Sequence, residues 1–279
     1  MAEQEGYIKI RGEVLHYLKW GSGVRLLLAF HGYANDAGIF QLFEKYLNKD
    51  FTIVSIDLPH HGKSRWTENT FLSLQDLIEL VSQVMEMQQV EKISLLGYSM
   101  GGRVCLSLIE HMPEKIEKVI LIAPDGLVTD TYYYFFTRTQ VGKRLFKHFL
   151  TNHQPWFKVI DWMKDRKLID AARHKFVMQY MHTEERRKFL WQVWPCMSKL
   201  MPRQKIVKQN IANYQIPVLI FMGAYDKVIP PSLAKKFVEG LETAKLFVLE
   251  KGHRVFDTEN AREIAEITRV PIPLKIENQ

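Results

Sequence analysis

The sequence predicts an α/β fold, in which a mostly parallel sheet carries helices on both faces and an all-helical segment follows the fourth parallel strand. Three observations predict it. Short apolar runs alternate with segments of helical periodicity along most of the chain, the order expected of a parallel sheet with crossover helices. The apolar runs lack polar alternation, as is typical of strands buried on both faces. Residues 125–213 interrupt this alternation and show helical stretches only.

The elements follow in order from the amino terminus. The first twenty residues alternate around Gly12, which predicts a β-hairpin. Buried strands are then expected at 24–30, 51–57, 92–98 and 118–124, separated by helices at 38–48, 71–89 and 104–112. After the insertion, strands at 216–223 and 244–250 alternate with helices at 232–241 and 257–268. We therefore predict a core domain of residues 1–124 and 214–279, interrupted by an all-helical insertion of residues 125–213.

The sharpest local motif is Gly97-Tyr98-Ser99-Met100-Gly101, which follows an expected strand and precedes a helix. In that context G-x-S-x-G is typical of a nucleophile elbow, a turn so tight that its central residue takes an unfavourable backbone conformation. Glycine on both sides of the serine removes Cβ clashes. The motif predicts Ser99 as a nucleophile at the start of a helix, whose dipole favours developing negative charge. A Gly-Ser turn without a catalytic role is the alternative interpretation.

A serine hydroxyl is a weak nucleophile and needs a base. In this arrangement the acid follows the serine along the chain, and the histidine follows the acid. His253 stands apart from the other nine histidines because it comes after the last expected strand, behind Gly252. Asp226 follows the strand at 216–223 and is the expected acid. Asp125, directly after the fourth parallel strand, is the alternative acid.

An oxyanion hole is expected from two backbone N–H groups, those of Met100 and Tyr33. Met100 follows the nucleophile, and Tyr33 lies in the loop after the first parallel strand. Backbone donors leave no side-chain signature, so Tyr33 is placed by its loop position alone. His31 in the same loop is interpreted as a structural histidine that hydrogen-bonds the loop.

Across essentially its whole length the chain resembles the α/β-hydrolase superfamily. The resemblance rests on FHGY (30–33), DLPHHGKS (57–64), GYSMGG (97–102), MGAYDKVIP (222–230) and KGH (251–253). It implies an α/β-hydrolase fold in which the insertion at 125–213 is a helical cap, or lid, over the active site. The chain departs from the family's D-L-P-G-H-G-x-S at His60, where glycine is usual. His60 and His61 lack a third ligand in metal-binding spacing, so we expect a solvated or loop-structuring role for them.

The predicted cap has an unusual composition. It holds 17 Lys and Arg against 7 Asp and Glu, and 15 of the 33 aromatic residues. Most of the aromatic rings are expected to pack within the cap and on the core, and the rest to line an apolar cleft above Ser99. The positive charge is expected mostly on the outer face. Attraction of an anionic substrate or of an acidic membrane surface is the alternative use of that charge.

The expected reaction is hydrolysis of a carboxylic ester, or of a thioester or other acyl bond, through an acyl-enzyme on Ser99. His253 is the expected general base, and Asp226 orients it. One alternative is carbon–carbon bond hydrolysis, or a lyase step like that of menaquinone synthesis, whose elbow resembles GYSMGGR (97–103). Arg254 counts against the carbon–carbon hydrolases, which often carry an aromatic residue after the histidine. A non-catalytic ligand-binding relative is the third reading.

Composition limits the other kinds of protein that this chain could be. Cys105 and Cys196 lie far apart, which gives neither a disulfide framework nor metal spacing, so no metal and no cofactor are expected. The acidic amino terminus lacks the apolar core of a signal peptide, and no apolar run is long enough to span a membrane. A cytoplasmic protein is therefore expected. The basic residues match no nucleic-acid-binding motif, so the expected partner is a small acyl substrate with an apolar group. The oligomeric state has no signature in the sequence.

Overall fold

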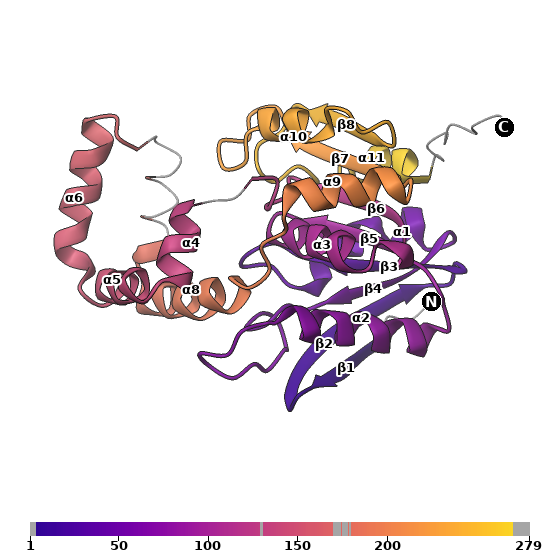
Figure 1. Ribbon diagram of the computed structural model, residues 1–279, viewed down its shortest axis with the longest axis horizontal. Helices are drawn as coiled ribbons and strands as arrows, with labels where there is room; N and C mark the ends of the chain where they lie inside the picture. The colour runs from indigo at the N-terminus through magenta and orange to yellow at the C-terminus, as the bar shows by residue number, and fades with distance from the viewer. Residues whose placement is uncertain (1–3, 129–130, 170–173, 175–177, 179, 270–279) are drawn as a thin grey trace. The chain divides into compact units, whose positions relative to one another are not determined.

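The computed structural model describes residues 4–128, 131–169, 174, 178 and 180–269 (Figure 1). They divide into two compact units. The first unit comprises the described parts of residues 1–66, 73–128 and 200–279. The second comprises the described parts of residues 67–72 and 129–199. Each unit has its own architecture.

A single sheet forms the centre of the first unit. Its eight strands, in the part of the chain that the structure describes, lie in the order β1-β2-β4-β3-β5-β6-β7-β8. The strands are β1 (Gln4–Ile10), β2 (Glu13–Gly21), β3 (Arg25–Phe30), β4 (Phe51–Ile56), β5 (Ile93–Tyr98), β6 (Ile116–Ile122), β7 (Val218–Gly223) and β8 (Ala244–Leu249). The β1–β2 and β2–β4 pairs are antiparallel, and all other pairs are parallel. The predicted hairpin and the mostly parallel sheet are therefore confirmed.

Helices cover both faces of this sheet (Figure 1). In the first unit they are η1 (Ala37–Phe43), α1 (Glu44–Leu47), α2 (Leu74–Gln88), α3 (Met100–His111), η2 (Pro113–Lys115), α9 (Gln204–Asn213), α10 (Pro231–Val238) and α11 (Ala261–Arg269). Helix α2 begins at a capping box, in which Ser73 Oγ accepts from Asp76 N and Asp76 accepts from Ser73 N. The α/β-hydrolase fold predicted from the sequence is the one observed.

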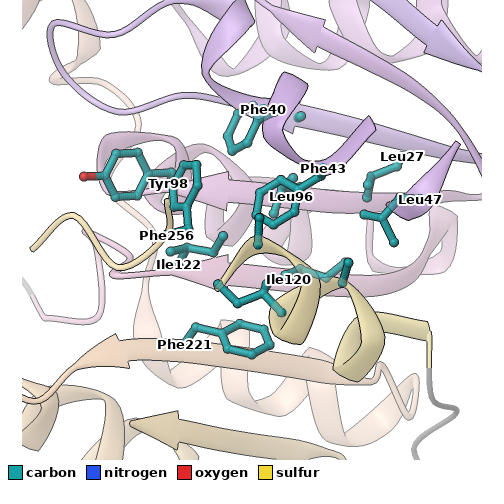
Figure 2. Close-up of a cluster of buried hydrophobic side chains, with 14 of the residues drawn as sticks. Leu27, Phe40, Phe43, Leu47, Leu96, Tyr98, Ile120, Ile122, Phe221 and Phe256 are labelled. Carbon is teal, nitrogen blue, oxygen red and sulfur yellow. The ribbon is translucent and has the colours of Figure 1, made fainter. Parts of the chain in front are cut away.

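One sheet face packs on η1, α1 and α11 through a continuous apolar cluster (Figure 2). Successive strand residues point to opposite faces, so Leu27 of β3 lies on this face while its neighbours face the other helices. Phe40 and Phe43 of η1 contact the ring of Phe256 at centroid distances of 6.0 and 5.3 Å. Each side chain buried this fully contributes about 1.5–3 kcal/mol to the stability of the fold. The cluster makes the sheet a rigid support for the loops at its edge.

Among its described residues, the second unit consists of helices joined by turns, together with the non-helical segment 67–72. Its helices are α4 (Thr131–Arg138), α5 (Gln140–Thr151), α6 (His153–Asp165) and α8 (Glu184–Met197). Aromatic rings form its own core: Phe146 lies 5.7 Å from Trp191 and 5.6 Å from Trp194, and Tyr133 lies 5.5 Å from Trp194. The Tyr133 hydroxyl donates to Trp194 O at 2.7 Å. The expectation that these rings pack within the insertion holds for this cluster.

The unit boundaries differ from the predicted 125–213 at both ends. Helix α9 belongs to the first unit, because Asn210 Nδ2 donates to the carbonyls of Ile109 and Glu110 at the end of α3, at 2.9 and 3.0 Å. Residues 67–72 belong to the second unit. There Leu72 N donates to Cys196 O at 3.0 Å, and further polar contacts tie the segment to α8. Both ties join segments far apart in the chain, which composition does not reveal.

No helix in the described part of the chain is both long and apolar enough to cross a lipid bilayer.

Candidate active site

The predicted site residues follow the carboxyl ends of parallel strands of one sheet. Ser99 comes directly after β5, Asp226 three residues after β7, and His253 four residues after β8. The loop that begins at His31 follows β3. Parallel strands end at one edge of the sheet, where ligands of such folds bind.

Ser99 occupies a tight turn that requires glycine two residues before it and two residues after it. Its φ is +49° and its ψ is −114°, a conformation that residues with a Cβ seldom adopt. A Cβ on Gly97 would lie 2.7 Å from Gly101 O, and a Cβ on Gly101 would lie 1.8 Å from Phe30 O. Ser99 N donates to Ile122 O at 2.9 Å and fixes the turn against β6. The tight elbow predicted from the motif is therefore observed, with backbone strain at the residue that carries the hydroxyl.

Ser99, His253 and Asp226 form a continuous hydrogen-bonded chain. Ser99 Oγ lies 3.0 Å from His253 Nε2, and His253 Nδ1 lies 2.8 Å from Asp226 Oδ2. The Asp226 side chain is fully buried, and its Oδ1 accepts from the backbone N–H groups of Val228 and Ile229 at 2.8 and 2.9 Å. The carboxylate is thus held in one orientation, with one oxygen directed at the imidazole.

The alternative acid, Asp125, has other partners. Its Oδ2 accepts from the Arg103 guanidinium, and its Oδ1 accepts from Gly126 N at 2.6 Å. Asp125 N in turn donates to Ser99 O at 2.8 Å. Asp125 therefore links β6 to α3 through Arg103, and the structure brings Asp226 to the histidine.

Residues 23–254 match the family described as serine aminopeptidase, S33. The match spans well over half of the chain. The chain belongs to this family. It is an α/β hydrolase, as the sequence resemblance implied.

The relatives of this S33-family hydrolase are distant. It is 24% identical over 238 residues to the uncharacterized hydrolase YugF of Bacillus subtilis, covering 84% of this chain and 85% of that protein. It is 23% identical over 255 residues to a monoacylglycerol lipase of Bos taurus, covering 86% of this chain and 73% of the relative. Among solved structures, it is similar to MGS-M2, an α/β hydrolase enzyme from a Medee basin deep-sea metagenome library. The two structures superpose with a TM-score of 0.68 at 15% sequence identity, over 97% of this chain and 100% of MGS-M2. This similarity shows a shared fold.

The two expected oxyanion donors of this S33-family hydrolase lie on different elements. Met100 is the first residue of α3, and the first N–H groups of a helix have no partner within it. Tyr33 lies in the loop after β3, beside buried His31 and Gly32. Their donation to a substrate stays a prediction.

Two buried histidines hold the Tyr33 loop. His31 Nδ1 lies 2.8 Å from Gly32 O and His31 Nε2 accepts from Leu58 N at 3.0 Å, which places the proton on Nδ1. His61 Nδ1 lies 2.9 Å from Pro59 O, and its Nε2 accepts from Ala34 N at 3.2 Å. Burial lowers the pKa of both side chains, that of His61 to about 3. The structural roles expected for His31 and His61 agree with these contacts.

The departure at His60 falls at a position whose backbone conformation favours glycine. His60 has a φ of +66°, in the left-handed region that favours glycine, which accounts for the glycine usual at this position. Gly62 in the same loop has a φ of +51°, and a Cβ there would lie 1.9 Å from Asp57 Oδ2. Asp57 is buried and accepts from Ala37 N at 2.6 Å and from Lys63 N at 2.8 Å. This loop therefore folds around one carboxylate and supports the His31 loop beside it.

Tyr98 is a contact residue that the sequence analysis did not single out. Its hydroxyl donates to His253 O at 3.3 Å, and its ring centroid lies 5.8 Å from that of His253. A Cβ on Gly32 would lie 3.0 Å from the same ring. Tyr98 therefore touches both the histidine loop and the loop of the expected oxyanion hole. The only sequence feature that pointed to Tyr98 was its place inside the G-x-S-x-G motif, and the motif accepts any residue at that position.

The geometry permits proton transfer from serine to histidine. With Asp226 ionised, His253 carries its proton on Nδ1 and donates it to Oδ2. Nε2 then presents a lone pair to the hydroxyl of Ser99, so the serine becomes a nucleophile when the imidazole accepts its proton.

Proposed function

We propose that this hydrolase cleaves carboxylic esters with an apolar acyl group, through an acyl-enzyme on Ser99. The observation that carries the proposal is the chain of hydrogen bonds from Ser99 Oγ to His253 and on to Asp226, 3.0 and 2.8 Å long. In this proposal His253 is the general base, and Asp226 holds the imidazole in the required tautomer and stabilises the imidazolium.

Acylation begins when Ser99 Oγ attacks the ester carbonyl and His253 Nε2 takes the hydroxyl proton. The carbonyl oxygen becomes an oxyanion, to which the N–H groups of Met100 and Tyr33 donate. Each such donor changes the rate by about 10²–10³. The imidazolium then protonates the leaving alcohol as the C–O bond breaks, and the acyl group remains on Ser99.

Deacylation repeats these steps with water. His253 takes a proton from the water molecule, whose oxygen attacks the acyl carbon through a second oxyanion. Collapse of that intermediate returns the proton to Ser99 Oγ and releases the carboxylic acid. The scheme needs no cofactor.

Two observations favour an apolar ester. The chain is similar over most of its length to a monoacylglycerol lipase, whose name describes an ester of glycerol with one acyl group. The insertion predicted as a cap is rich in aromatic residues, and we propose that the second unit selects substrates by apolar contact. Each buried acyl methylene would then contribute about 0.8 kcal/mol, roughly fourfold in affinity.

A series of p-nitrophenyl esters tests the proposal, with Ser99→Ala as the matched inactive variant. We expect kcat/KM to rise from acetyl to medium-chain esters and to change little with added salt. A preference for acetyl esters would contradict apolar selection. An ester with a carboxylate on its acyl chain belongs in the panel: its faster cleavage than the neutral ester, with a steep loss at added salt, would show that the basic charge attracts the substrate. A vinylogous diketone and an aminoacyl p-nitroanilide belong in the same panel. Faster cleavage of the diketone would favour the carbon–carbon alternative, and faster cleavage of the anilide would favour peptide-bond hydrolysis.

A further inference from the structure

The second unit carries a charge that the proposed hydrolysis does not use. Residues 67–72 and 129–199 hold 14 Lys and Arg against 7 Asp and Glu, a net charge of +7. The whole chain has the same net charge of +7, so the first unit is neutral overall. A unit with a strong charge of one sign attracts surfaces of the opposite sign.

The carboxyl end of α6 combines this charge with exposed apolar side chains. Val159, Trp162 and Leu168 are exposed by 40, 50 and 59%. Four exposed cations are interleaved with them: Lys158, Lys164, Arg166 and Lys167. We call residues 158–168 the α6 patch. The patch also holds two carboxylates, of which Asp161 lies 2.7 Å from His174 Nε2, and its net charge is +2.

Trp162 has the character of an interfacial residue. The Arg166 guanidinium lies 5.3 Å from the centroid of its indole ring. A tryptophan ring offers a large apolar body with one polar N–H, and lysine and arginine place an apolar stem beneath a charged head. Both side-chain types suit the boundary between lipid headgroups and acyl chains.

The exposed side of α5 has the same mixed character. Phe146 and Leu150 of α5 are buried. Val141 and Leu145 are exposed one helical turn apart, and exposed Arg144 lies between them in the sequence. Apolar and cationic side chains together on an exposed helix are typical of helices that lie in a membrane interface.

We propose that the α6 patch docks on an anionic phospholipid bilayer. Trp162, Val159 and Leu168 enter the headgroup boundary, and the cations beside them pair with lipid phosphate and carboxylate groups. An acidic protein is a poorer fit, because the core of a protein interface is depleted of lysine, whereas here the cations lie among the apolar side chains. A second copy of this chain would bring the same positive charge.

Vesicle flotation of the full chain tests this proposal. The vesicles contain phosphatidylcholine with or without phosphatidylserine, at low and high salt. We expect binding to the phosphatidylserine vesicles only, and its loss at high salt. Trp162→Ala should weaken binding roughly tenfold, and the double variant Arg166→Gln/Lys167→Gln should weaken it at least tenfold, at roughly fivefold per cation.

Matched controls come from the first unit. Lys235→Gln/Lys236→Gln removes the same charge from exposed positions of α10, and Tyr7→Ala removes an exposed aromatic side chain from β1. Both should bind vesicles like the unaltered protein, and so should Ser99→Ala, because docking is separate from hydrolysis. Equal weakening by control and patch variants would overturn the proposal. A Trp162→Ala protein that binds vesicles normally but loses activity on soluble esters would also overturn it, since Trp162 would then act in hydrolysis or folding and not in membrane docking. Binding to an acidic protein but to no vesicle would also overturn it.

Discussion

Replacing Asp226 with asparagine should force His253 into the tautomer that cannot accept a proton from Ser99. The hydrogen bonds around the carboxylate explain this effect. Oδ1 accepts from the N–H groups of both Val228 and Ile229, and Oδ2 faces His253 Nδ1. An asparagine with its carbonyl oxygen toward the two N–H groups must direct its NH₂ at Nδ1. The imidazole then carries its proton on Nε2 and cannot accept one from Ser99.

The opposite orientation of the amide is costly. It would place the NH₂ against two partly buried N–H donors, and each donor left facing the NH₂ costs about 1–3 kcal/mol. The bias toward the wrong tautomer is therefore about 2–6 kcal/mol, or roughly 30-fold to 10⁴-fold. We expect kcat of Asp226→Asn to fall by about 10³–10⁴ with a small change in KM, as carboxylate removal does in other triads.

Steady-state hydrolysis of p-nitrophenyl butyrate measures this loss, and thermal unfolding of the variant shows whether it is folded. Asp125→Asn is the matched control. Asp125 bonds to Arg103 and to Gly126 N, and a partly exposed pair of this kind contributes about 0–1 kcal/mol, so activity should stay within about fivefold. If Asp125→Asn costs orders of magnitude while Asp226→Asn is mild, the structural reasoning has the wrong acid. If both are mild, no carboxylate orients the histidine.

Two further predictions concern the loops around the site. Because burial lowers the pKa of His61 to about 3 from the ordinary 6.5, the unfolded chain binds more protons between these values, and stability falls as the pH drops below about 6.5. This side chain alone should lower the free energy of unfolding by about 1.4 kcal/mol between pH 8 and pH 5.5. Urea unfolding of His61→Gln should show a shallower decline, and an equal decline would refute the assignment. Tyr98→Leu should lower kcat by about 10–100-fold through misplacement of His253, whereas Tyr98→Phe, which loses one 3.3 Å hydrogen bond, should lower it less than about fivefold. Equal effects of the two variants would show that the ring does not position the histidine.

The sequence was most informative where local chemistry restricts the backbone. Gly97 and Gly101 predicted the elbow because a Cβ at either position would collide with a neighbouring carbonyl. The inner strands β3 to β7 were predictable because burial on both faces requires continuous apolar runs. The choice between Asp226 and Asp125 was different, since both follow a strand of the same sheet. Only the fold shows that one carboxylate faces His253 and the other faces Arg103.

The unit boundaries were less predictable for a related reason. Residues 204–213 are helical and basic like the insertion before them. Their assignment to the first unit depends on the hydrogen bonds of Asn210 to the end of α3. The segment at 67–72 is too short to carry a compositional signal. Contacts between distant segments decide such boundaries, and a single sequence does not record them. For the same reason the contacts of Tyr98 were missed.

Fluorophosphonate labelling of the folded protein, followed by mass spectrometry of the adduct, tests the central claim most directly. The probe reacts with a serine that an adjacent base has activated, and the structure places such a base 3.0 Å from Ser99 Oγ. We predict a single adduct, on Ser99, that His253→Ala abolishes and Asp125→Asn leaves in place. An adduct on another serine, or no adduct on protein that hydrolyses esters, would contradict the account.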